Sequence, residues 1–380
     1  MKTLILWIDA VRQDYVNEKD MPFLYSLSKK YGLGELKQSF GFSSASFFTG
    51  VYPNKHGQLA LYKKGKQKKS LLLKILPNFI KNYYFNLINY LKGNDLFMPY
   101  LDKKDFIPSQ KKQFHHQDCL KVKTIFDSFR ENKLKYLYYQ WPLMVTNNKT
   151  KLSFCKNNDL TRVKKFIKIF KNNQDIYFFH LWDLDKYGHI YGPESKQLRL
   201  KLKEQDNLAK KILSLFNLEK DNLIIWSDHG MVNIKQTVNI QSILPKRSDY
   251  LYFLDGTMAR FWFTNKEAKE AVFKSLNSIK CGHILSQEEK KKHKIDFKNE
   301  DNGEEIFLLD NSYAILPNFF NKDIIKGMHD YDLTDKNDLG IFIINKKTGK
   351  TANMVDMCPT ILDILNIKYK DLDGKSLLIQ

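Results

Sequence analysis

An aspartate and a histidine stand side by side where an apolar run ends, in the stretch LIIWSDHGM at 223–231. The apolar residues at 223–226 are too few for a helix and are typical of a buried strand. Asp228 and His229 are therefore predicted at the carboxyl end of a strand, the edge of an open α/β sheet where ligands bind. Carboxylate and imidazole groups both bind divalent ions, and Gly230 would leave room for an ion or substrate to approach. The pair indicates half of a metal site.

Three more places in the chain carry groups of interest. Asp9 ends the first apolar run, and Asp185 and His189 stand four residues apart directly after another one. His329 lies in a glycine-flanked loop. Each group taken singly also fits a turn or a helix cap, and Asp183 competes with Asp185. Because the ends of parallel strands meet at one sheet edge, we expect these side chains to converge on the Asp-His pair.

A serine-rich turn, SFGFSSASFFTG at 39–50, opens a short apolar helix that ends at Gly50. Backbone N–H groups at a helix N-terminus suit a phosphoryl or sulfuryl group. A serine at such a position is also a common helix cap. The turn is therefore a second candidate for chemistry.

The elements that must position these residues alternate between strands and helices, which predicts an α/β fold with a parallel sheet covered on both faces. The expected strands are residues 3–8, 136–139, 176–180, 223–226 and 339–344, and the expected helices are residues 22–31, 118–131, 159–172, 198–217 and 359–365.

Two segments interrupt this alternation. Residues 61–116 alternate lysine pairs with aromatic and aliphatic clusters, which favours a basic, amphipathic helical insertion. Residues 235–325 are expected to form an irregular cap that contains one strand, 258–263. The chain 1–380 is thus predicted to be a single elaborated domain with two insertions. The first insertion is interpreted either as a lid that recruits an anionic, lipid-linked or polymeric substrate, or as a structural hairpin covering the sheet.

Composition indicates an anionic partner. The chain has 62 Lys and Arg against 42 Asp and Glu, a formal charge of +20. This charge favours phosphate esters, acidic lipid or nucleic acid, and nucleic acid ranks last because no nucleic-acid module is evident.

The four cysteines form no CxxC pair, which fits free thiols in a reducing compartment. The N-terminal apolar run is too short for a signal peptide and no run reaches the length of a membrane span. We therefore expect a cytoplasmic protein, with peripheral contact to an anionic membrane as an added possibility.

Taken in order, these motifs resemble the alkaline phosphatase superfamily, and within it the type I phosphodiesterase/nucleotide pyrophosphatase group. The resemblance covers residues 3–57, 176–232 and 327–378, including TGVYPNKHG at 49–57 and the tail segments MVDMCPTILD at 354–363 and DGKSL at 373–377. It implies an alkaline-phosphatase-like, mainly parallel sheet with helices on both faces.

The resemblance also implies two divalent metal ions, Zn²⁺ or alternatively Mn²⁺. Asp9, Asp228, His229 and the nucleophile would hold one ion. Asp185, His189 and His329 would hold the other. Paired ions about 4 Å apart can clamp the attacking and leaving oxygens of an in-line displacement.

The nucleophile is where the chain departs from the pattern. In many relatives it precedes the Thr-Gly pair by roughly nine residues, and counting back nine from Thr49 reaches Phe40, which carries no nucleophilic group. Ser43 is our first choice, Ser44 the second and Ser39 the third. Either the loop is shortened or the site is altered.

The sequence is thus interpreted as a metal-dependent hydrolase of phosphate esters, above all a phosphodiesterase, with a serine nucleophile. A phosphotransferase on the same core is the nearest alternative. A sulfatase would need the Cys/Ser-x-Pro-x-Arg signature, which is missing, and a phosphoglycerate mutase usually has a different serine motif. A non-catalytic, basic surface-binding protein on a degenerate core is the remaining alternative.

Overall fold

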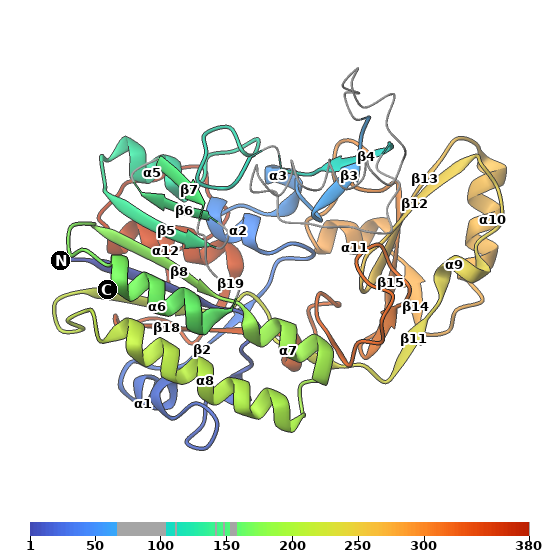
Figure 1. Ribbon diagram of the computed structural model, residues 1–380. Coiled ribbons are helices and arrows are strands. Elements are labelled where there is room, and N and C mark those ends of the chain that lie inside the picture. Colours follow the sequence, from blue (N-terminus) through green and yellow to red (C-terminus); the bar gives the residue numbers. More distant parts are fainter. Residues whose placement is uncertain (67–103, 111, 141–142, 147–148, 153–157, 380) are drawn as a thin grey trace.

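A nine-stranded sheet forms the centre of the computed structural model, which describes residues 1–66, 104–110, 112–140, 143–146, 149–152 and 158–379 (Figure 1). The strands follow the order β19-β2-β18-β9-β1-β8-β5-β6-β7. Their bounds are β1 (Thr3–Ile8), β2 (Gly34–Lys37), β5 (Tyr136–Gln140), β6 (Leu143–Thr146), β7 (Lys149–Leu152), β8 (Ile176–Leu181), β9 (Asn222–Trp226), β18 (Gly340–Ile344) and β19 (Thr351–Asn353).

The four central strands β9, β1, β8 and β5 are parallel to one another. On either side of them, β18 pairs with β9 and β6 pairs with β5 in antiparallel orientation. In the register of this sheet Ile8 is opposite Leu181, and Trp7 is opposite Trp226. The chain therefore leaves β1, β8 and β9 at the same edge. This arrangement confirms the predicted α/β class and brings the residues after each of these strands together.

Successive side chains of β1 point to opposite faces of the sheet, as the geometry of a strand requires. Leu4 and Leu6 pack into the core beneath α1 (Pro22–Tyr31), α6 (Asp159–Ile169) and α8 (Lys196–Leu213). Ile5 and Trp7 pack into the core beneath α2 (Ser44–Thr49), α5 (Ile125–Glu131) and α12 (Met357–Ile364). Both faces are thus covered, which explains why β1, β8 and β9 are mostly apolar rather than alternating.

Local signals in the sequence set the helix ends. Ser195 caps α8 by accepting a hydrogen bond from the Leu198 N–H, 3.1 Å. Gly50 ends α2 with a φ of 69°, the left-handed region that glycine adopts at no steric cost. The predicted short helix after the serine turn is therefore present and stops where expected.

Residues 235–325 are regular, and the prediction of an irregular cap is wrong. A four-stranded antiparallel sheet in the order β12-β13-β15-β14 lies beside the main sheet (yellow to orange in Figure 1). Aromatic and aliphatic side chains on one face of it pack against α10, which accounts for its stability. The elements of residues 235–325 are β11 (Gln236–Val238), α9 (Ile240–Ile243), β12 (Tyr250–Leu254), β13 (Met258–Phe263), α10 (Lys266–Leu276), β14 (Gly282–Ile284), α11 (Gln287–Lys292), β15 (Glu305–Leu309) and β16 (Tyr313–Ile315).

The helical insertion predicted at 61–116 lies mostly outside the described residues. Its two described ends form an antiparallel pair, β3 (Tyr62–Lys64) and β4 (Phe106–Pro108), so these ends are strands rather than helix. Among the residues that the structure describes, no helix is long and apolar enough to cross a membrane.

A buried histidine holds the loop after α2 in place. His56 is the last residue of α3 (Pro53–His56) and is 1% exposed. The Gln58 N–H donates to its Nδ1 (3.2 Å), so the neutral ring carries its proton on Nε2, which lies 3.1 Å from Ser46 Oγ. Burial lowers the pKa of His56 to about 3.

We expect His56 to make the protein less stable as the pH falls. The folded state disfavours the protonated ring, so this contribution is fully present above pH 6.5, the ordinary value, and is lost as the pH falls toward 3. The free energy of unfolding should fall by about 1.4 kcal/mol for each pH unit in that window. Urea unfolding of the wild type and of His56→Gln between pH 5 and 7 measures this slope as their difference. Equal slopes in the wild type and in His56→Gln would contradict the assignment.

Candidate active site

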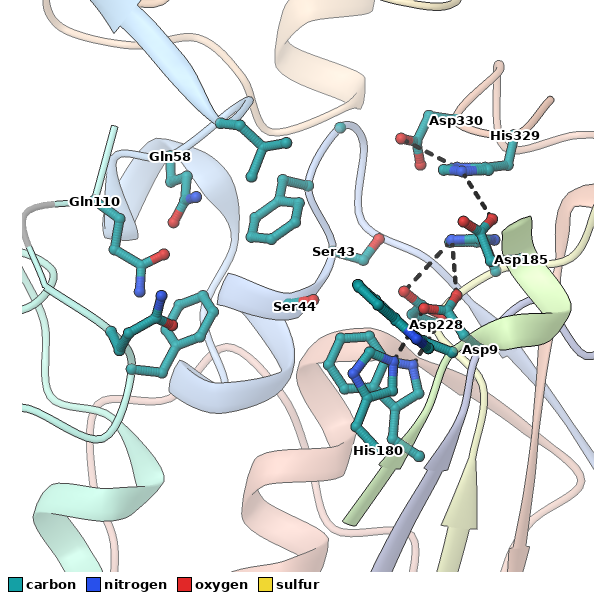
Figure 2. A pocket seen from close by; sticks show the side chains of 18 of the residues that line it. Asp9, Ser43, Ser44, Gln58, Gln110, His180, Asp185, Asp228, His329 and Asp330 are labelled. Carbon is teal, nitrogen blue, oxygen red and sulfur yellow. Dashed lines mark hydrogen bonds and ion pairs between the residues drawn. The ribbon is translucent and has the colours of Figure 1, made fainter. Parts of the chain in front are cut away.

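Three neighbouring strands deliver the predicted acidic residues to one pocket at the carboxyl edge of the sheet (Figure 2). Asp9 follows β1 directly, and Asp228 and His229 follow β9. Asp185 lies in the first turn of α7 (Asp183–Tyr191), the helix that follows β8. His329 reaches the same pocket from the loop after β17 (Gly327–Met328), which pairs with β10 (Val232–Asn233).

The first group of potential metal ligands consists of Asp9, Asp228 and His229. Its donor atoms all lie within 4.8 Å of one another. His229 Nε2 is 3.3 Å from Asp9 Oδ1 and 3.5 Å from Asp228 Oδ2. These are three of the residues that the resemblance assigned to one ion.

A second group consists of Asp185, His229 and His329, again with donor atoms within 4.8 Å of one another. Asp185 Oδ1 lies 3.5 Å from His329 Nε2, and the rings of His229 and His329 stack at 3.6 Å between centroids. His229 therefore stands between the two groups, where the resemblance had placed it with the first ion only.

His189 adjoins the second group without belonging to it. Its Nδ1 donates to the Gly327 carbonyl oxygen at 2.9 Å, which leaves Nε2 facing Asp185 Oδ1 at 3.2 Å. The spacing of four residues brings Asp185 and His189 to the same side of α7, as a helix requires.

The electrostatics of the pocket fit a bound cation. Burial and the adjacent charge of Asp228 raise the pKa of Asp9 well above its usual range. Burial would also raise the pKa of Asp185, but the imidazoles of His189 and His329 outweigh it and lower that pKa. Asp9 Oδ1 and Asp185 Oδ1 are buried and have no hydrogen-bond partner among the described residues. Mixed carboxylate and imidazole donors suit zinc or manganese, so the residues fit the metal ions that the family pattern implies.

Two side chains that sequence reasoning missed orient the first group. His180, near the end of β8, places Nε2 3.0 Å from Asp9 Oδ2 and stacks on Trp7 at 3.7 Å between ring centroids. The Trp7 indole N–H donates to Asp228 Oδ1 at 3.0 Å. The only sign in the sequence that His180 has a function is that it is a polar residue in an otherwise apolar strand.

His329 has its own support. Its Nδ1 is 3.3 Å from Asp330 Oδ2, and Asp330 adopts a φ of 66°. Asp338 accepts hydrogen bonds from the backbone N–H groups of Asp330 and Tyr331, 3.3 and 2.8 Å. This buried carboxyl, whose pKa burial raises to about 6, fixes the loop that carries His329. In the sequence, the only sign that Asp330 has a role in the site is that it directly follows His329.

Asp183, the competitor of Asp185, has a structural role. Its Oδ2 accepts the Asp159 N–H at 3.0 Å, while Asp159 Oδ2 accepts the Asp183 N–H at 2.8 Å. The two aspartates thus tie the first turns of α6 and α7 together. Gly230 is also structural, because a Cβ there would collide with the Asn337 carbonyl oxygen rather than with a ligand.

The serine candidates differ in position. Ser43 and Ser44 line the pocket, which has a volume of about 360 Å³, together with the first ligand group. Ser43 precedes α2, and its Oγ donates to the Ser39 carbonyl oxygen at 3.0 Å. Phe40, at the position counted from relatives, is buried with its ring 4.5 Å from that of His293. Ser39 is not among the residues that line the pocket.

Comparison with known protein families identifies the family of this chain. Residues 3–332 match the family described as type I phosphodiesterase / nucleotide pyrophosphatase. The chain belongs to this family, which confirms the resemblance seen in the sequence and assigns it to a family of phosphoric ester hydrolases.

Two curated relatives match a short segment. GPI ethanolamine phosphate transferase 1 of Homo sapiens is 33% identical over 86 residues, which is 19% of this chain and 9% of that protein. The Mus musculus protein of the same name is 31% identical over 87 residues, with the same shares of 19% and 9%. The match therefore spans less than a tenth of the length of these relatives.

Solved structures resemble the whole fold. Human ectonucleotide pyrophosphatase/phosphodiesterase 5 has a TM-score of 0.71 at 18% identity, covering 99% of this chain and 97% of that chain. The murine protein has a TM-score of 0.68 at 17% identity, covering 99% and 98%. An inactive variant of the murine protein in complex with AMP has a TM-score of 0.67 at 18% identity, covering 99% and 97%. These likenesses show that the fold is shared.

We expect Trp7→Phe to weaken metal binding, because it removes the hydrogen bond that orients the Asp228 carboxylate. Losing such an outer-shell partner typically lowers metal affinity by about 10- to 100-fold. Titration of metal-free protein with Zn²⁺ measures the change. Trp226→Phe is the matched control: Trp226 stacks on Trp7 at 4.7 Å between ring centroids, but its indole nitrogen has no partner among the described residues. Equal affinities in both variants would contradict the role of the hydrogen bond.

Proposed function

We propose that this protein is a metal-dependent phosphodiesterase that uses Ser43 as its nucleophile and binds two divalent ions, with zinc as the first choice and manganese as the alternative. The observation that carries the proposal is the pair of ligand groups on either side of His229, in the same pocket as Ser43. Membership of the type I phosphodiesterase / nucleotide pyrophosphatase family supports the same reaction class.

The residues divide the work as follows. Asp9, Asp228 and His229 would hold one ion, and Asp185 with His329 would hold the other, with His189 as an adjoining ligand. Ions in such a pair lower the pKa of an attacking hydroxyl and stabilise charge on the attacking and leaving oxygens. His180 and Trp7 hold the carboxylates of the first group in place, so that the site does not have to reorganise when substrate arrives.

In this proposal Ser43 acts by covalent catalysis. Its Oγ would bond to phosphorus and lose its proton, while the alcohol of the ester leaves and takes up a proton. Water would then displace the serine oxygen, which releases a phosphomonoester and restores the hydroxyl. Figure 2 shows Ser43 on the side of its loop that faces Asp228. Ser44 lines the same pocket and is the second choice.

A phosphotransferase is the second candidate, and the relatives favour it specifically. The proteins matched at 33% and 31% identity are named as ethanolamine phosphate transferases. The same serine chemistry serves both reactions, because only the acceptor of the second step differs: water in a hydrolase, a substrate hydroxyl in a transferase. The cytoplasmic location and the contact with an anionic membrane expected from the sequence stay predictions.

We expect Ser43→Ala to lower kcat for a phosphodiester by several orders of magnitude and to leave Zn²⁺ affinity nearly unchanged, because a nucleophile cannot be replaced by a methyl group. Ser44→Ala is the matched control and should retain most of the activity. Turnover of bis(4-nitrophenyl) phosphate and calorimetric Zn²⁺ titration measure the two effects. Loss of activity in Ser44→Ala alone would move the assignment to Ser44, and full activity in both variants would exclude a serine nucleophile.

A panel of esters separates the reaction classes. The wild type with Zn²⁺ or Mn²⁺ should hydrolyse phosphodiesters faster than phosphomonoesters or sulfate esters. Adding an alcohol such as ethanolamine tests the transferase alternative, because a transferase would produce the new phosphodiester at the expense of the phosphomonoester. Absence of turnover on every ester with both metals would contradict the proposal.

A further inference from the structure

The pocket that holds the ligand groups continues past the serines to a second end, where the side chains labelled in Figure 2 are amides rather than carboxylates. Gln58 and Gln110 line this end, and their amide groups point toward one another (Figure 2). In the same view, the labelled carboxylates lie on the other side of Ser43 and Ser44. Gln113 lines the pocket as well. None of these glutamines contributes to the proposed metal site.

The amides at this end lack the partners that buried amides normally have. Gln58 is 1% exposed, and neither its Oε1 nor its Nε2 has a hydrogen-bond partner among the described residues. The Nε2 of Gln110 is also buried and has no hydrogen-bond partner among the described residues. Burying a polar group without a partner costs stability, and nearly all such groups in proteins are paired. Unpaired amides aimed into an open pocket therefore point to a ligand.

The loop that carries Gln58 is tied to the loop that carries Ser43. The Phe42 N–H donates to the Leu59 carbonyl oxygen at 2.8 Å. A Cβ on Gly41 would collide with that same carbonyl oxygen, so the two loops touch directly. On its other side, the Gln58 N–H donates to the buried ring of His56. The distance between the amide and the serine is thus set by the fold, as a subsite for part of a substrate requires.

The surroundings of the amides specify the chemistry of the ligand. Apolar side chains also line this pocket, including Phe42, Leu61 and Pro108. A primary amide carries both donors and acceptors and no charge. Such a lining suits an uncharged group that both donates and accepts hydrogen bonds and has an apolar face.

We propose that Gln58 and Gln110 form a subsite for the uncharged, hydrogen-bonding portion of a phosphate ester, either a hydroxyl-bearing sugar or polyol or the edge of a nucleobase. This inference rests on the proposed function, since it names the portion of the substrate attached to the reacting phosphorus. The subsite selects among esters, whereas the ligand groups and Ser43 act on all of them.

The test compares esters that share a 4-nitrophenyl group but differ in the second substituent. Gln58→Leu should lower kcat/KM about tenfold for the thymidine or the glyceryl 4-nitrophenyl phosphodiester, because it removes hydrogen bonds to that substituent. For bis(4-nitrophenyl) phosphate, kcat/KM should stay within about twofold. The thermal midpoint should stay the same or rise, because an unpaired buried amide is lost. Whichever ester is affected identifies the source, nucleoside or polyol.

Gln197→Leu is the matched control, because Gln197 is exposed on α8 and should change none of these values. Gln110→Leu should repeat the selectivity of Gln58→Leu. Equal losses on all three esters, or no loss on any, would overturn the subsite while leaving the proposed function intact.

A binding measurement separates this inference from the proposed function. In calorimetry, Gln58→Leu should bind AMP or glycerol 3-phosphate about tenfold more weakly than the wild type does. Both proteins should bind phenyl phosphate equally well. These monoesters need no turnover to bind. A selective loss in a protein that hydrolyses no ester would retain the subsite and reject the hydrolase. Unchanged affinities for both monoesters would reject the subsite.

Discussion

Repulsion between buried carboxylates is the constraint on which the site depends. The parallel register of β1, β8 and β9 brings Asp9, Asp185 and Asp228 to one edge of the sheet, in the same pocket. Burial disfavours the ionised form of Asp9, and the adjacent charges of Asp228 and Asp185 add to this effect, so the pKa of Asp9 is raised. The sheet cannot move these carboxylates apart. Its strand register is fixed, because both of its apolar faces pack against helices. Divalent cations relieve the repulsion directly, so the fold and the proposed metal site explain each other.

Neighbouring side chains orient the carboxylates of the first ligand group. Asp9 and Asp228 each have one carboxylate oxygen engaged by a neighbour outside the ligand set, His180 for Asp9 and Trp7 for Asp228. Asp9 Oδ1 remains free of hydrogen bonds among the described residues and lies 3.3 Å from His229. The division into one oriented and one available oxygen is what a ligand needs. Asp330 plays a similar part for His329 through the other ring nitrogen.

The sequence predicts the parts of the site that follow strands. Asp9 and Asp228 each end an apolar run, so strand periodicity places them at the sheet edge, and the spacing of Asp185 and His189 suits one side of a helix. His180 could not be found in this way, because it lies within a strand and acts only through Asp9, a contact between segments far apart in the chain. The four-stranded sheet at 235–325 was missed because its strands are short, and their pairing is antiparallel and spread over a long segment. Gln58 and Gln110 belong to no motif, and only the folded structure shows that they line the same pocket.

The central claim is that the two ligand groups around His229 hold two metal ions. Anomalous X-ray diffraction at the zinc absorption edge, on crystals of the wild type grown with Zn²⁺, tests it most directly. Two peaks about 4 Å apart are expected, one contacted by Asp9 and Asp228 and the other by Asp185 and His329. A single peak, or peaks away from these side chains, in crystals of protein that hydrolyses phosphodiesters would contradict it.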